Sequence, residues 1–353
     1  MLAASMPPRV SSVYPALGAD REGDIPLSMN IAIIGCRTMG EVHAAMATAA
    51  GCTVVKCIDK DLKAAKALAK QYGAAAGDDP AKAFKRKDVD LVCIATPTPT
   101  HRPLVAQAAK AGKDIFCEKP LCRTEKECKD AVLAAEKAGV KLFVGHVVRY
   151  FQEYEALRAQ VRSGAISTPG FVRMYRGGQC PDGTGSWFRD FKQSGGVVMD
   201  CSIHDIDWVR HTFGEVTRVF CQNLMRKQPE PLDYAVTTLR LGDDLIAQVT
   251  GSWAHPSGFR TWVEVCGARG MLQYDSADAP IISQPRGKAG AGAGTIVPKS
   301  PVAVSPYQLE WEDALAWFQR DRTPRVLPED AIRAVQLAEA ALKSAGTGQP
   351  VKV

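Results

Sequence analysis

The sequence predicts an α/β protein in two parts: a doubly wound parallel sheet, then an α/β region with an open, mostly antiparallel sheet. Two observations support this. Short apolar runs alternate with helical patterns between residues 30 and 144, which is typical of right-handed βαβ units. Beyond residue 170, long stretches rich in Val, Thr, Tyr and Trp have few helices between them, which favours antiparallel pairing.

The first part begins with Ile31–Gly35, an apolar run that ends in glycine, as expected of a buried parallel strand. Gly73 is a typical stop for the helix expected at residues 61–72. We expect further strands at 53–58, 90–95, 114–117 and 141–144, and helices at 39–50, 61–72, 101–111 and 124–138. We interpret residues 29–147 as a nucleotide-binding domain of Rossmann type.

The second part, residues 148–353, is interpreted as a substrate-binding and oligomerisation domain. Its strands are expected at 170–176, 216–222, 234–241, 245–254, 260–267 and 271–274. Its helices are expected at 153–163, 201–213, 307–320 and 329–344. Residues 276–305 are of low complexity and predict a flexible loop.

Residues 1–28 differ from the rest of the chain. They contain four prolines, at positions 7, 8, 15 and 26, and no periodic apolar pattern, which predicts a disordered extension. They also lack the basic start and apolar core of a secretory signal. One hypothesis is that translation starts at Met29, directly before the first strand.

Composition excludes several classes of protein. The net charge of +6 is spread along the 353 residues, which argues against a nucleic-acid partner. The eleven cysteines are scattered, without zinc-site spacing, as in a reduced cytoplasmic protein. Because no apolar run reaches about 18 residues, we predict a cytoplasmic protein without a membrane-spanning helix.

The segment Gly35-Cys-Arg-Thr-Met-Gly40 follows the first strand and opens the first helix. It matches the pattern G-x-G-x-x-G of dinucleotide-binding turns, except that Arg37 replaces the middle glycine. The pyrophosphate of such a cofactor lies at the helix N-terminus. Asp59 ends the second strand, where its carboxylate can bind both ribose hydroxyls and repel a 2′-phosphate. NAD is therefore favoured over NADP, although the neighbouring Lys60 leaves NADP open.

A second segment, Thr96-Pro-Thr-Pro-Thr-His101, follows another strand on the same carboxyl edge of the sheet, where ligands of open α/β sheets bind. Its threonine hydroxyls can reach a cofactor ribose, while Thr100 serves equally well as a helix N-cap. The residues predicted to bind the cofactor are Gly35, Arg37, Thr38, Met39, Gly40, Asp59, Thr96, Pro97, Thr98, His101, Glu118 and Lys119.

A catalytic group is predicted from two further segments. Lys119 follows a buried strand, between Glu118 and Pro120, and so projects over the cofactor edge. Asp200, His204 and Asp207 are at positions i, i+4 and i+7 and therefore share one face of a helix. Histidine suits a general base, and Asp200 can orient it or bind a substrate hydroxyl. A divalent metal is a weaker alternative, and we predict none.

On these segments the chain resembles the glucose-fructose oxidoreductase / inositol dehydrogenase / MocA (Gfo/Idh/MocA) family over residues 29–353. The matching pieces are 35–40, Asp59, 96–101, Glu118-Lys-Pro120, Gly145-His-Val-Val-Arg149 and Gly195-Gly…Asp200-x-x-x-His204-Asp205. The resemblance implies a Rossmann domain, NAD(P) as cofactor, a catalytic set matching Lys119, Asp200 and His204, and an open sheet that often joins dimers or tetramers.

The resulting hypothesis is hydride transfer between a nicotinamide and a secondary hydroxyl or ketone of a sugar, cyclitol or sugar derivative. Val148 stands where inositol dehydrogenase-like members often have a second arginine, so sugars in general are favoured over inositol itself. The substrate-binding residues are predicted to be Lys119, Arg149, Trp187, Asp200 and His204. Two alternatives are a non-catalytic sensor of NAD(P) or sugar, and a sugar–sugar oxidoreductase with tightly bound NADP.

Overall fold

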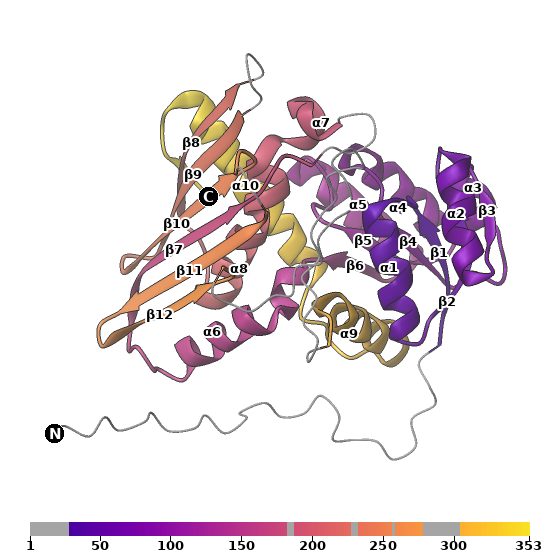
Figure 1. The fold of residues 1–353 in the computed structure, drawn as a ribbon, viewed down its shortest axis with the longest axis horizontal. Coiled ribbons are helices and arrows are strands. Elements are labelled where there is room, and N and C mark those ends of the chain that lie inside the picture. The colour runs from indigo at the N-terminus through magenta and orange to yellow at the C-terminus, as the bar shows by residue number, and fades with distance from the viewer. Residues whose placement is uncertain (1–27, 182–186, 227–231, 256–257, 278–303) are drawn as a thin grey trace.

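The computed structural model describes residues 28–181, 187–226, 232–255, 258–277 and 304–353. The chain forms two sheets with helices packed around and between them (Figure 1). The predicted disordered extension, residues 1–28, and the predicted low-complexity loop, residues 276–305, lie almost entirely outside the described residues.

The first sheet has six parallel strands in the order β3-β2-β1-β4-β5-β6, which confirms the doubly wound arrangement. Residues of β4 and β6 are buried throughout, because helices cover both faces of a parallel sheet. The strands are β1 (Asn30–Ile34), β2 (Thr53–Ile58), β3 (Ala75–Gly77), β4 (Leu91–Ile94), β5 (Asp114–Glu118) and β6 (Leu142–Gly145).

The helices of this part are α1 (Thr38–Ala49), α2 (Leu62–Tyr72), α3 (Pro80–Phe84), α4 (His101–Lys110) and α5 (Glu125–Ala138). Neither β3 nor α3 was expected from the sequence. The strand is only Ala-Ala-Gly, which has no apolar alternation, and α3 is a helix of five residues. Elements this short depend on the packing of their neighbours rather than on their own periodicity.

The second sheet is mixed but mostly antiparallel, as predicted, in the order β12-β11-β7-β10-β9-β8-β13. Among the described strands of this sheet, only β7 and β10 are paired in parallel. The two-residue strand β13 was not expected from the sequence. The strands are β7 (Pro169–Gly177), β8 (Arg218–Arg226), β9 (Leu232–Leu241), β10 (Leu245–Ser252), β11 (Arg260–Gly267), β12 (Gly270–Asp275) and β13 (Val351–Lys352).

The helix expected at 201–213 has an irregular start. A π-helical turn covers Val198–Ser202, and the α-helix α8 runs from Ile203 to Phe213. Turns of this kind are common at functional sites, and this one contains Asp200. The other elements here are α6 (Gln152–Arg162), the 3₁₀ turn η3 (Trp187–Arg189) and α7 (Phe191–Ser194).

The two last helices connect both sheets. Helix α9 (Pro306–Arg320) packs on α1, and its Trp311 ring stacks on Phe116 of β5 with 4.3 Å between ring centroids. Helix α10 (Pro328–Thr347) contacts β8, α5 and α8 (Figure 1). A domain boundary between residues 147 and 148 remains a prediction, and α9 covers part of the first sheet from beyond it. No described helix is both long and apolar enough to cross a membrane.

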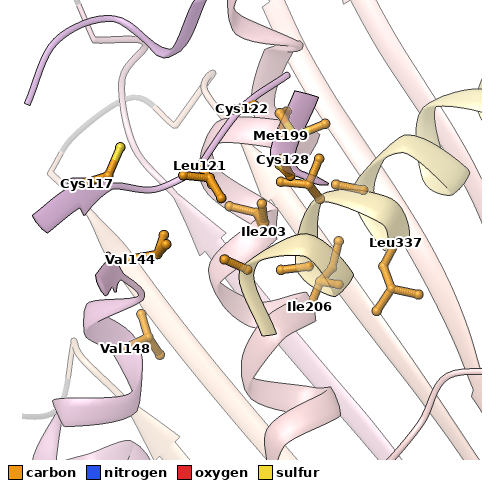
Figure 2. Packing of buried hydrophobic residues seen from close by; sticks show 14 of the residues in the cluster. Cys117, Leu121, Cys122, Cys128, Val144, Val148, Met199, Ile203, Ile206 and Leu337 are labelled. Atoms are coloured by element: carbon orange, nitrogen blue, oxygen red, sulfur yellow. The ribbon is translucent and has the colours of Figure 1, made fainter. Parts of the chain in front are cut away.

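One hydrophobic cluster joins the segment after β5 to α8 and α10. Figure 2 shows Leu121 and Cys122 of that segment beside Met199 and Ile203, with Leu337 of α10 packed in the same cluster. All these side chains are buried. This packing holds the end of β5 against the start of α8, which is where the predicted catalytic residues lie.

Candidate active site

Two glycines are required by the backbone of the turn after β1. Gly35 has φ +93°, and a Cβ on it would lie 2.6 Å from the Ala95 carbonyl oxygen. A Cβ on Gly40 would lie 1.8 Å from the Gly35 carbonyl oxygen. The close approach of strand and helix at this turn therefore excludes any side chain at either position.

Arg37 does not need the freedom of glycine, because its φ is −99°. Its guanidinium is engaged outside the Gly35–Gly40 segment, where it donates a hydrogen bond of 2.7 Å to Asp61 Oδ2. As the N-cap of α1, Arg37 makes no side-chain cap within the described structure. Thr38, Met39 and Gly40 thus form an uncapped helix start, which is the arrangement that binds a pyrophosphate.

Asp59 follows β2 and lies beside this turn. Its Oδ2 accepts a hydrogen bond from the Cys36 N–H, and its Oδ1 accepts one from the Asp61 N–H, both at 2.8 Å. A carboxylate oxygen has two acceptor sites, so both oxygens retain one for a ribose hydroxyl. The glycine turn, the helix start and Asp59 together fit a dinucleotide such as NAD.

The segment after β4 contains Thr96 and Pro97, and then the 3₁₀ turn η1 (Thr98–Thr100). The Thr96 and Thr100 hydroxyls are hydrogen-bonded to each other at 2.7 Å, at the surface, whereas Thr98 is buried. Thr96 and Pro97 therefore remain candidates for the cofactor edge, and Thr98 supports them from inside.

His101 is placed differently from the prediction. The side chain is buried, with Nε2 2.8 Å from the Thr96 carbonyl oxygen and Nδ1 3.0 Å from that of Pro120. Burial lowers the pKa of His101, and the ring joins the segment after β4 to the segment after β5. His101 is thus a link between two loops rather than a cofactor ligand.

Glu118 also points inward rather than toward a cofactor. Its Oε1 accepts a hydrogen bond from His43 Nε2 at 2.8 Å, and its Oε2 accepts one from the Lys119 N–H at 2.9 Å. His43 Nδ1 in turn accepts a hydrogen bond from Trp311 Nε1, which fixes its tautomer. Burial opposes ionisation of Glu118, but His43 and Lys119 outweigh it and lower the pKa of the carboxyl. Glu118 therefore positions Lys119.

Lys119 and Asp200 meet across the two halves of the molecule. Lys119 follows β5 and precedes a cis peptide bond to Pro120. Its Nζ donates to the Asp200 carbonyl oxygen at 2.7 Å and to Asp200 Oδ1 at 3.2 Å. An ammonium group has three N–H donors, so one is left for a substrate oxygen. The predicted role of Asp200 in orienting His204 does not fit this pairing.

His204 lies on α8, one turn after Asp200, and is half-buried. Its Nδ1 is buried without a hydrogen-bond partner in the described structure, which leaves Nε2 as the nitrogen available to a substrate. Burial lowers the pKa of His204 well below its usual value, and the nearby positive charges of Lys119 and Arg176 lower it further. The imidazole is therefore neutral at pH 7, as a general base must be.

Arg149, predicted to bind substrate, is instead part of a buried ion-pair network. Its Nε and Nη2 donate to the two carboxylate oxygens of Asp207 at 2.8 and 2.6 Å. Its Nη1 donates to Asp330 Oδ2 at 2.9 Å and to the Arg325 carbonyl oxygen at 2.6 Å. Four of the five guanidinium N–H donors are used in this way, and only 1% of the side chain is exposed, so the group is closed to a ligand. Asp207 is in turn paired with Arg149, so it does not contribute to the helix face on which His204 was predicted to act.

Trp187 lies in η3, and its ring packs on Phe188 with 4.1 Å between centroids. The adjoining α7 contacts η1, which places this loop along the predicted cofactor edge. Trp187 is half-buried and remains a candidate for the substrate pocket.

One residue in this group had no role assigned from the sequence. His146 directly follows β6, as Lys119 follows β5, and Glu118 and Gly145 are paired in the sheet. The strand-end position that identified Lys119 could have identified His146 as well. In the described part of the chain, no three His, Cys, Asp or Glu side chains are grouped as metal ligands.

Comparison with known proteins agrees with this arrangement. Residues 29–146 match the family described as an oxidoreductase family with an NAD-binding Rossmann fold, and residues 154–273 match the GFO/IDH/MocA C-terminal domain. The scyllo-inositol 2-dehydrogenase (NAD(+)) of Bacillus subtilis is 28% identical, covering 91% of this chain and 95% of that protein. The D-apiose dehydrogenase of Paraburkholderia graminis is also 28% identical, covering 91% and 89%.

Among solved structures, GenD2 from gentamicin A biosynthesis, in complex with NAD, is similar with a TM-score of 0.84 and 25% identity. The similarity covers 95% of this chain and 99% of GenD2. Together, the two matched ranges cover the whole first sheet, strands β7 to β11 of the second, and both Lys119 and His204. The chain therefore belongs to the Gfo/Idh/MocA family of oxidoreductases, with an amino-terminal NAD-binding Rossmann fold.

Proposed function

We propose that this protein is an NAD-dependent dehydrogenase that oxidises a secondary hydroxyl of a sugar, cyclitol or sugar derivative, or catalyses the reverse reduction. The observation that carries the proposal is the contact of Lys119 Nζ with Asp200, one helical turn before His204. This contact supports an arrangement in which an ammonium group and a neutral imidazole act together at the carboxyl edge of the first sheet, where dinucleotides bind in this fold.

The residues divide the chemistry between them. When bound, NAD supplies the hydride acceptor. Lys119 donates its remaining N–H to the substrate oxygen and stabilises the negative charge that develops there. His204 Nε2 takes the hydroxyl proton. Asp200 holds the Lys119 ammonium group in place through its carbonyl and carboxylate oxygens.

The substrate class is inferred from the relatives, among which are dehydrogenases of scyllo-inositol and D-apiose. A polyol fits a site that offers hydrogen-bond donors and acceptors at the reacting carbon. Asp59 favours NAD, because its carboxylate would repel a 2′-phosphate. We also propose a homodimer or homotetramer in the cytoplasm, with the open face of the second sheet as the subunit interface.

The test is a panel of myo-inositol, scyllo-inositol, D-glucose, D-apiose and levoglucosan with NAD and NADP, followed by the absorbance of the reduced cofactor. We expect turnover of at least one compound with NAD and a large loss of turnover in Lys119→Ala and His204→Ala. NAD binding without turnover of any compound would favour a sensor. Reduced or oxidised NADP retained through purification would favour the sugar–sugar oxidoreductase.

A further inference from the structure

Three carboxylates lie near His204 in sequence, one in the π-helical turn and two on α8, and each is paired with a cation from another element. Asp200 contacts Lys119. Asp205 accepts hydrogen bonds from Arg176 Nε at 3.0 Å and Nη2 at 2.7 Å. Asp207 is paired with Arg149. Asp205 Oδ2 has no partner in the described structure, but neither it nor the other two carboxylates is hydrogen-bonded to His204 Nδ1. None of them therefore fixes the tautomer of His204, as the aspartate of a Ser-His-Asp triad would.

His146 lies where such a partner is needed. It follows β6 at the same level as Lys119 on the adjacent strand β5, since Glu118 and Gly145 are paired, and neighbouring strands are about 4.8 Å apart. Its Nδ1 lies 3.8 Å from Asp207 Oδ2, and Asp207 is one turn of α8 beyond His204. His146 therefore lies against the helix that carries His204.

The imidazole of His146 is almost fully buried, and neither ring nitrogen has a hydrogen-bond partner in the described structure. The same holds for Nδ1 of His204. A buried polar atom left unpaired costs about 1–3 kcal/mol. One water molecule shared between His204 Nδ1 and His146 Nε2 would satisfy two of these atoms, while His146 Nδ1 faces Asp207.

We propose that His146 is a positioning residue for His204: its Nε2 accepts, through one water molecule, the hydrogen bond of the His204 Nδ1–H. The inference rests on the proposed function, in which His204 is the base. The negative charge of Asp207 keeps the proton of His146 on Nδ1, so that Nε2 is the acceptor. His204 then carries its own proton on Nδ1, and its Nε2 is free to take the substrate proton.

The first test reads the tautomer directly and needs no substrate. Long-range ¹H–¹⁵N correlation spectra of the full chain with NAD resolve the ring nitrogens of its six histidines, assigned by single substitutions. We expect His204 as the Nδ1–H tautomer in the wild type, and a mixture of tautomers in His146→Leu. His146→Gln, whose amide group can occupy the Nε2 position, should restore the Nδ1–H form.

The second test is kinetic, with the panel compound that gives the highest kcat/KM. His146→Leu should lower kcat by roughly 10- to 100-fold, a part of what a placed base contributes, with little change in KM. His146→Gln should recover most of that loss. His211→Leu, one turn beyond Asp207 on the same helix, is the matched control and should change neither the tautomer of His204 nor kcat.

The outcomes separate this inference from the proposed function. If His204→Ala is inactive while His146→Leu has wild-type kcat and an unchanged His204 tautomer, the inference is wrong and the function stands. If His204→Ala retains activity, His204 is not the base and both fail. Thermal unfolding of every variant identifies those that do not fold. If His146→Leu does not fold, the tautomer of His204 in the wild type and in His146→Gln is the test. An Nε2–H tautomer of His204 in either protein contradicts the inference.

Discussion

Lys119 Nζ contacts both the carbonyl oxygen and the carboxylate of Asp200. Lys119 belongs to the half of the molecule with the first sheet, and Asp200 belongs to the half with the second. The pair is largely buried, with 15% and 17% of the side chains exposed. The reacting groups are therefore held by the packing between the two halves, and each half supplies one part of the site.

The first prediction concerns these groups. Lys119→Ala and His204→Ala should each lower kcat by about 10²–10⁴-fold, the contribution of a placed acid or base. Lys129→Ala removes a lysine with an exposed side chain on α5 and serves as the control. Steady-state kinetics with the best panel compound measure the effect. Near-wild-type turnover of both variants would show that neither residue takes part in the chemistry.

The second prediction separates a structural from a substrate-binding role of Arg149. Arg149→Met leaves Asp207 buried and unpaired, which should lower the free energy of unfolding by about 3–5 kcal/mol. The double variant Arg149→Met/Asp207→Leu should recover much of this loss. Urea unfolding gives both values. An unchanged stability with a raised KM would instead restore Arg149 to the substrate pocket.

The third prediction concerns Arg37, which interrupts the glycine pattern. Its ion pair with Asp61 joins side chains that are 45% and 39% exposed, and such pairs contribute about 0–1 kcal/mol. Arg37→Gly should therefore leave unfolding almost unchanged and NAD affinity similar or better, as isothermal titration would report. A loss of about tenfold, or 1.4 kcal/mol, would mean that the guanidinium leaves Asp61 to bind the cofactor phosphates.

The fourth prediction concerns cofactor choice. Asp59→Ala removes hydrogen bonds from a charged acceptor, each contributing about 1.5–3 kcal/mol, so the Kd for NAD should rise at least about tenfold. The preference for NAD over NADP should fall, because no carboxylate then opposes the 2′-phosphate. Asp88→Ala removes an exposed carboxylate that is paired with Arg86 and is the control. An unchanged ratio of the two affinities would place the adenosine ribose elsewhere.

The fifth prediction concerns pH and stability. Burial lowers the pKa of His146, His204 and His211 in the folded chain, that of His211 to about 3, whereas the unfolded residues titrate near 6.5. Below pH 6.5 the unfolded state then binds more protons, so stability falls as pH is lowered toward the folded pKa values. Thermal unfolding between pH 7 and pH 4 should show this loss, and His211→Leu should reduce it. Stability independent of pH over this range would mean that these histidines have the same pKa in the folded chain as in the unfolded chain.

The cofactor turn and the position of the catalytic lysine could be predicted from the sequence, because both depend on short motifs and on their place after a strand. Gly35 and Gly40 follow from a turn motif, and Lys119 from its place directly after a buried strand. The partners of charged groups could not be predicted in this way. Asp200, Asp205 and Asp207 are equivalent in type, and which cation each one meets depends on strands and helices far away in the chain.

The inward positions of Glu118 and His101 were missed for the same reason. Both lie at strand or loop ends where ligands bind, but buried partners from α1 and from the segment after β5 turn them inside. Short elements such as β3 and β13 were missed because two or three residues show no periodicity.

The stacking of Trp311 on Phe116 also bears on how the chain is made. During synthesis the nucleotide-binding sheet leaves the ribosome long before α9, the helix that covers Phe116 and supplies the indole donor to His43. Nascent chains that end before residue 306 therefore expose an aromatic face and leave the His43–Glu118 pair without its third member. The cofactor-binding half gains these Trp311 contacts only when translation is nearly complete.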